Sequence, residues 1–301
     1  MTSPAVTAPA TSVSTWRTVR DYVSLTKPRI VELLLVTTVP AMVVAAGGWP
    51  GTGLVAATVI GGALVSGSAH ATNMVYDRDI DAAMARTADR PLAAGRIQPV
   101  PALVFALALL VVGALLLHVV AGWLAAAITV AAWLHYVVVY TVWLKRRNPQ
   151  NIVIGGAAGA LPPVIGWAAV TGSVAAPAWV MFAVVVLWTP SHFWALAIGT
   201  GDDYERAAVP MLPAVRGPDV AARHGAGYAI ATVLASFGLP LTGVGGLPLT
   251  VAAAVLGAWF VGRAVALIRR PDTATAWRLF RTSIAYLGLL FVAIAITGLL
   301  A

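Results

Sequence analysis

The 301-residue chain contains no cysteine, which excludes disulfides, thiolate metal sites and cysteine nucleophiles. Charge is also scarce, because Asp, Glu, Lys and Arg make up 10% of the residues, against about 25% in a soluble domain. Hydrophobic residues make up 60% of the chain, and the mean hydropathy is +0.88. This composition excludes a soluble globular domain and predicts a polytopic membrane protein.

The first sixteen residues are rich in Ala, Ser, Thr and Pro and lack the apolar core of a signal peptide. Such a segment cannot bury enough apolar surface to fold by itself. We therefore predict a disordered cytoplasmic tail over residues 1–21 and a single transmembrane domain over residues 22–301.

Nine apolar stretches are near or above the length that spans a bilayer. They lie at about 30–49, 53–74, 100–119, 122–143, 151–171, 176–199, 226–244, 247–268 and 283–301. Frequent Gly and Pro within them favour close helix packing and breaks beside a cavity. The predicted fold is all-α, a membrane bundle of about nine transmembrane helices.

All nineteen Lys and Arg residues fall in the N-terminal segment or in alternate connections between the spans. The net charge of +8 follows this distribution and does not indicate a nucleic-acid partner. By the positive-inside rule this side is cytoplasmic. We expect the two long polar loops on it, residues 75–99 and 200–224, to form the active site.

Three polar side chains recur every four residues at the end of the second span: Asn73, Asp77 and Asp81. Positions i, i+4 and i+8 share one helix face, so the three side chains can direct oxygen atoms at one point. Ionisable groups at a membrane edge are costly and are functional by default. Mg²⁺ prefers oxygen ligands and shares them with substrate phosphates, so this spacing predicts a metal-dependent enzyme.

Three arginines follow the ladder formed by Asn73, Asp77 and Asp81, within fifteen residues of its end. They are Arg86, Arg90 and Arg96. Guanidinium groups hold phosphate oxygens by charge-assisted hydrogen bonds, so together with a metal they suit a diphosphate. Taken without the ladder, the arginines are better explained as a solvated cytoplasmic loop.

A second acidic cluster follows the sixth span, with Asp202, Asp203, Tyr204, Glu205 and Arg206 in succession. Two acidic sites at equivalent helix ends can hold two ions across one diphosphate. The alternative is a polar cluster that caps a junction between a helix and a loop.

Two further groups of residues suggest an acceptor site. His192 lies between Trp188 and Trp194 in the sixth span, and aromatic walls suit an isoprenoid chain or a planar macrocycle. Lys145 and Arg146 lie close to Asn151 at the entrance of the fifth span and can hold propionates or diphosphate. An interior histidine and a topology determinant are the respective alternatives.

Several longer motifs carry a family resemblance over about residues 22–217. They are Leu25-Thr-Lys-Pro-Arg29, Asp77-Arg-Asp-Ile-Asp81, Pro149-Gln-Asn-Ile-Val-Ile-Gly-Gly, Trp188-Thr-Pro with His192-Phe-Trp-Ala-Leu, and Val209-Pro-Met-Leu-Pro. In these motifs the chain resembles the UbiA-type intramembrane prenyltransferases, and within them the haem-farnesylating subfamily. The last three spans match in hydropathy alone.

The resemblance implies transfer of farnesyl from farnesyl diphosphate to a vinyl group of haem B, giving haem O and diphosphate for haem A/O-type terminal oxidases. It implies a multi-pass protein of a prokaryotic plasma membrane, with a haem A synthase as partner. The implied catalytic residues are Asn73, Asp77, Asp81 and Asp203. These four residues and Asp202 are the implied ligands of Mg²⁺. The implied substrate-binding residues are Lys27, Arg29, Arg86, Arg90, Arg96, Lys145, Arg146, Asn151, His192, Tyr204 and Arg206.

One departure from the family pattern lies at Gly199-Thr-Gly201, where members usually carry a basic residue before the Asp-Tyr pair. Either a basic diphosphate contact is missing there, or Arg206 or Lys145 supplies it. Two other functions remain open at this stage. They are prenyl transfer to a quinone precursor or chlorophyllide, and a transporter whose carboxylates bind a coupling cation.

Overall fold

The computed structural model describes residues 15–300, apart from the side chains of residues 29–35. Within this part the chain is helical and contains no strand. The α-helices are α1 Thr15–Leu25, α2 Pro28–Ala46, α3 Thr52–Tyr76, α4 Arg78–Ala83, α5 Pro99–Leu134, α6 Asn151–Ala160, α7 Pro162–Thr171, α8 Ala176–Gly199, α9 Asp203–Arg206, α10 Leu212–Arg216, α11 Pro218–Ser236, α12 Gly238–Leu241, α13 Gly246–Arg269 and α14 Thr273–Leu299, and a π-helix, η1, spans His135–Leu144.

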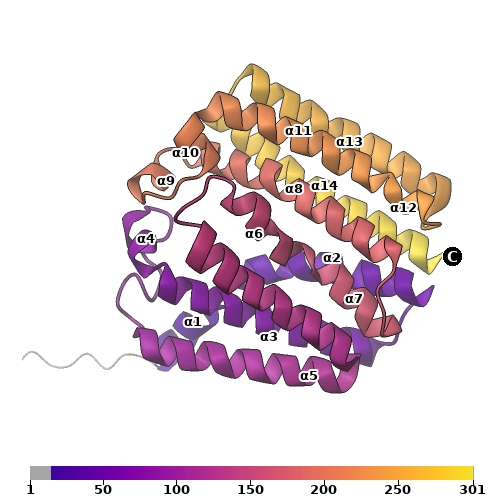
Figure 1. Ribbon diagram of the computed structural model, residues 1–301, viewed down its shortest axis with the longest axis horizontal. Helices are drawn as coiled ribbons and strands as arrows, with labels where there is room; N and C mark the ends of the chain where they lie inside the picture. The colour runs from indigo at the N-terminus through magenta and orange to yellow at the C-terminus, as the bar shows by residue number, and fades with distance from the viewer. Residues whose placement is uncertain (1–14, 301) are drawn as a thin grey trace, which may run out of the picture.

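Six helical segments of the described chain are long and apolar enough to cross a membrane. They are Thr52–Tyr76, Pro99–Leu144, Asn151–Thr171, Ala176–Gly199, Gly246–Arg269 and Thr273–Leu299. The segment Pro99–Leu144 consists of two helical rods, because Gly122 (φ 87°, ψ 166°) interrupts α5 and the chain turns back there (Figure 1). Together with α2 and the pair α11–α12, which pack alongside them, residues 15–300 contain nine helical rods, and this confirms the predicted all-α bundle.

Residues 15–21 belong to α1 and are not the disordered segment predicted for them. Trp16, Val19 and Val23 recur at helical spacing and form an exposed apolar stripe. The Tyr22 ring packs edge-on against Phe105, with 5.1 Å between the ring centroids. This spacing and this contact explain why the segment is ordered. The rest of the predicted tail, residues 1–14, lies outside the described residues.

Six elements form a ring around the centre of the bundle: α2, α3, η1, α6, α8 and α14 (Figure 1). The last helix, α14, closes the ring because it packs against both α2 and α8. Close approach of α6 to its neighbours depends on glycine. A Cβ on Gly155 would lie 2.2 Å from the Tyr140 ring, and one on Gly156 would lie 2.6 Å from the Thr189 side chain.

The two long polar loops lie at the same end of the bundle, where Figure 1 shows α4, α9 and α10. Ile80 and Met84 from the first loop share a buried apolar cluster with Val209 and Met211 from the second. The two loops therefore form one layer over this end of the ring.

Candidate active site

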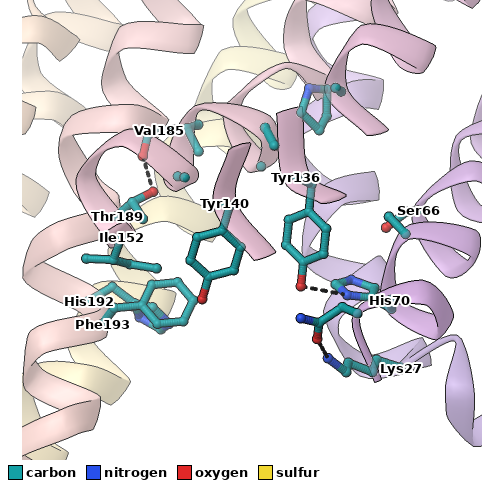
Figure 2. Close-up of a pocket in the computed structure, with 18 of the residues that line it drawn as sticks. Lys27, Ser66, His70, Tyr136, Tyr140, Ile152, Val185, Thr189, His192 and Phe193 are labelled. Atoms are coloured by element: carbon teal, nitrogen blue, oxygen red, sulfur yellow. Dashed lines mark hydrogen bonds between the residues drawn. The ribbon is translucent and has the colours of Figure 1, made fainter. Parts of the chain in front are cut away.

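A cavity of about 730 Å³ lies inside the ring and is lined by side chains from all six of its elements. Its mouth beneath the two loops is polar and charged, whereas its interior is mostly apolar and aromatic. Figure 2 shows Tyr136 and Tyr140 side by side on η1, with Tyr136 pointing toward His70 and Tyr140 toward His192 and Phe193. The volume and lining suit a large lipophilic molecule with a charged end.

The predicted ladder is present, but the helix that carries it breaks. Asn73 Nδ2 donates to Asp77 Oδ2 over 2.6 Å, as the i, i+4 spacing predicts. α3 ends at Tyr76, and Asp81 lies on the separate helix α4. The Asp81 N–H still bonds to the Asp77 carbonyl, at 2.8 Å, so Asp81 remains close, and it lines the cavity with Asn73.

Each of the buried carboxylates at this end is paired with a basic side chain. Asp77 is fully buried and pairs with Lys145, while Arg146 Nη2 lies 3.5 Å from its Oδ1. Arg90 Nη1 lies 2.8 Å from Asp81 Oδ1. Asp203 pairs in the same way with Arg206. Because an unpaired buried charge is strongly unfavourable, these ion pairs explain how the three carboxylates are accommodated in the interior.

Four basic side chains line the cavity mouth: Lys27, Arg86, Arg90 and Lys145. Lys27 Nζ donates to Asn73 Oδ1 over 3.0 Å. Burial, with the charges of Arg90 and Lys145 close by, lowers the pKa of Lys27 to about 7. Burial is the main cause of this lowered pKa, and the nearby cations Arg90 and Lys145 add to it. The cations that gather at the mouth form an environment that favours a diphosphate.

The oxygen atoms at the mouth suit a hard cation. Just behind the cavity surface, Asp77 Oδ1 is buried and accepts no hydrogen bond from the described residues, although donors surround Asp77. Asn73 and Asp81 add oxygen atoms at the cavity surface. No group of three or more His, Asp or Glu side chains is gathered for a metal in the described part of the chain. A Mg²⁺ here would therefore take ligands from substrate phosphates as well, as this ion usually does.

The aromatic end of the cavity holds His192 in one orientation. Its ring stacks on Trp188 and on Phe280, with centroid separations of 4.3 and 4.6 Å. The single Ser283 hydroxyl proton goes to the Phe280 carbonyl, at 2.7 Å, so Ser283 Oγ accepts from His192 Nδ1 over 2.8 Å. His192 Nε2 therefore keeps its lone pair, and the histidine lines the cavity.

The structure brings eight of the predicted site residues to the cavity lining: Lys27, Asn73, Asp81, Arg86, Arg90, Lys145, His192 and Tyr204. Asp77 and Asp203 are buried behind this surface, and so is Asn151, whose amide atoms make no hydrogen bond within the described residues. Asp202 is exposed, and Arg206 is occupied by Asp203.

Two of the arginines that were predicted to bind substrate do not line the cavity and pair with carboxylates outside it. Arg96 pairs with Asp21 and Asp89, which ties α1 to the first loop. Arg146 holds Asp79 with two bonds of 2.7 Å and lowers the pKa of Asp79 to about 2. The Arg29 side chain lies outside the described residues.

Sequence reasoning missed several lining residues, notably Tyr136, Tyr140, Trp133 and Phe280. The spacing of Tyr136 and Tyr140, four residues apart within a span, was an available signal. Phe280 and Ser283 lie on α14, for which the sequence offered a hydropathy pattern alone.

Comparison with known sequences settles the family. Residues 34–295 match the profile of the UbiA prenyltransferase family. The chain belongs to this family. A protein of Clavibacter michiganensis named "Protoheme IX farnesyltransferase" is 49% identical over 94% of this chain and 94% of its own length. A Thermus thermophilus protein of the same name is 48% identical over 95% of this chain, which spans just under half (46%) of that relative.

Solved structures show the same UbiA fold at low sequence identity. A digeranylgeranylglyceryl phosphate synthase superimposes with a TM-score of 0.78 at 16% identity, covering 95% of this chain and 100% of that one. A UbiA homologue from Archaeoglobus fulgidus bound to DMAPP and Mg²⁺ gives 0.68 at 17% identity, covering 92% and 99%. The architecture of the ring is therefore that of the family.

Proposed function

We propose that this protein transfers the farnesyl group of farnesyl diphosphate to a vinyl group of haem B, giving haem O and diphosphate. The observation that carries the proposal is a single cavity with a basic, carboxylate-rich mouth and an aromatic interior. The relatives named protoheme IX farnesyltransferase, at 48–49% identity, support haem B as the acceptor over a quinone precursor or chlorophyllide. A transporter is disfavoured because the acids lie at one end of the bundle, away from mid-membrane.

At the mouth, Lys27, Arg86, Arg90 and Lys145 bind the diphosphate oxygens by charge-assisted hydrogen bonds. Lys145 fills the role of the basic residue that is absent at 199–201, since Lys145 lines the cavity and Arg206 does not. Asn73, Asp77 and Asp81 hold Mg²⁺, with Asp203 as the acid from the second loop. When bound, Mg²⁺ neutralises charge on the diphosphate and stabilises it as a leaving group. The Archaeoglobus structure with DMAPP and Mg²⁺ supports this assignment.

In the aromatic interior, we propose that His192 Nε2 coordinates the haem iron. A hydrogen bond that fixes Nδ1–H is the usual arrangement of a metal-bound histidine, and Ser283 supplies it. The rings of Tyr136, Tyr140 and Trp188 face the farnesyl chain and the porphyrin. Asn151, with its unsatisfied buried amide, is the candidate contact for a polar substituent of haem.

The reaction breaks the C1–O bond of farnesyl diphosphate and joins C1 to the terminal carbon of the vinyl group. Water adds its oxygen to the inner vinyl carbon and releases one proton, and diphosphate leaves. The aromatic faces stabilise the allylic cation, and the apolar lining keeps water from reaching C1 early.

The positive-inside rule supports a cytoplasmic position for the mouth, in a prokaryotic plasma membrane. Because the product remains in the bilayer, a haem A synthase is the expected recipient of haem O.

The proposal is tested by offering the purified protein haem B and a quinone precursor together, with farnesyl diphosphate and Mg²⁺. Liquid chromatography with mass spectrometry should find haem O as the product and no prenylated quinone precursor. Prenylation of the quinone precursor in preference to haem B would contradict the proposal.

A further inference from the structure

A second cavity, of about 370 Å³, lies between the ends of α13 and α14, outside the ring that surrounds the first cavity. Four arginines line it: Arg263, Arg269, Arg270 and Arg278. Gly262, Val265, Ala266 and Thr275 complete its lining, and a Cβ at Gly262 would meet nothing within 4 Å. The proposed reaction uses none of these residues.

The charge of this cavity is not neutralised by the protein. Asp272 is the one acidic residue between positions 246 and 300. Its side chain caps α14 by accepting from the Thr275 N–H over 2.7 Å. No salt bridge to any of the four arginines is present within the described residues. The positive-inside rule explains why arginines are on this side, but it does not explain why four of them surround one hollow.

The apolar surface next to the cavity indicates what kind of anion fits. Val255, Trp259, Arg263 and Ala266 share one stripe of α13, at spacings of three or four residues. Val255 and Trp259 are 64% and 40% exposed and face the surroundings of the bundle. Arg263 lies about 9 Å deeper along α13 than Arg269, from the rise of about 1.5 Å per residue. A basic hollow thus continues directly into a lipid-facing apolar surface with a tryptophan at the boundary.

We propose that this cavity binds the phosphate headgroup of an anionic phospholipid, with the acyl chains lying along Val255 and Trp259. Basic pockets between membrane helices on the cytoplasmic side bind such headgroups. A free phosphate would use the arginines but not the apolar stripe, so the stripe favours the lipid.

The test uses the full-length protein in nanodiscs of phosphatidylcholine with increasing phosphatidylglycerol. The variant is Arg269→Gln with Arg278→Gln. The matched control is Arg216→Gln with Arg223→Gln, which removes two exposed arginines that line neither cavity. Native mass spectrometry measures retained phosphatidylglycerol, and circular dichroism checks that each variant is folded.

The wild type and the control should retain phosphatidylglycerol over phosphatidylcholine, and the cavity variant should bind it at least about tenfold more weakly. Millimolar inorganic phosphate should not displace the lipid. Equal retention by all three folded proteins, or equal loss in the control, would overturn the proposal. Displacement by inorganic phosphate would show a simple anion site and would also overturn it.

Discussion

At the residue scale, the site is organised by pairs of opposite charge. Asp77, Asp81 and Asp203 each have a basic partner, and two of these partners, Lys145 and Arg90, also line the cavity. The same cations can therefore neutralise the carboxylates in the empty site and bind a diphosphate in the loaded one. Arg206 pairs with Asp203 but does not line the cavity, so it cannot do both.

Replacing Lys145 by Gln should weaken the apparent affinity for farnesyl diphosphate by about 10- to 100-fold, because one charge-assisted hydrogen bond is lost. The measurement is the KM for farnesyl diphosphate at saturating haem B. Arg147→Gln is the control, because Arg147 is an exposed neighbour that does not line the cavity. An unchanged KM in the Lys145 variant would remove Lys145 from the diphosphate site.

Replacing His192 by Ala should shift the Soret band of bound haem B, because the iron would lose an imidazole ligand. Ser283→Ala should shift it less, since Ser283 acts by fixing the His192 ring. His224→Ala, at an exposed histidine, should leave the spectrum unchanged. Identical spectra for wild type and the His192 variant would refute iron coordination while leaving the proposed reaction intact.

At the scale of the elements, glycine positions set the width of the cavity. Gly155→Ala forces a methyl group against the Tyr140 ring, where 2.2 Å separates the two positions. The expected loss of stability is about 1–3 kcal/mol, seen as a lower thermal midpoint. Gly159→Ala on the same helix meets nothing within 4 Å and should be neutral or stabilising. Equal midpoints for the two variants would contradict this packing.

The elements also show what the sequence could predict. The lengths of the apolar stretches predicted the spans. The four-residue spacing of polar side chains predicted that Asn73, Asp77 and Asp81 are neighbours. The helix break at Asp77 was not predictable, because the i, i+4 pattern continues across it. The separate roles of Arg90 and Arg96 depend on which carboxylate each one reaches in three dimensions. Phe280 and Ser283 join His192 from about 90 residues away, and hydropathy does not report such contacts.

At the scale of the whole molecule, the two ends of the helix bundle differ in polarity. The polar loops lie at one end, and short glycine-containing turns lie at the other (Figure 1). Residues of both polar loops, such as Arg86 and Tyr204, line the cavity, so its mouth is at the same end as the loops. A lipophilic substrate can enter from the bilayer, while its charged group stays at the polar end.

The chain has no cysteine, so single cysteines can report its orientation directly. Ala94→Cys in the first loop should react with a membrane-impermeant maleimide only after cell lysis. Ser173→Cys, in the turn after α7, should react in intact cells. Both positions are exposed, so accessibility does not limit either reaction. Labelling of both from the same side would contradict the topology.

The central claim is that the charged mouth and the aromatic interior act on one reaction. The most direct measurement is diphosphate release and haem O formation in the same reaction, for wild type and for Asp77→Asn. The account predicts one diphosphate per haem O in the wild type, and loss of both products in the variant. Diphosphate release without haem O, or haem O formation at wild-type rates by Asp77→Asn, would contradict it.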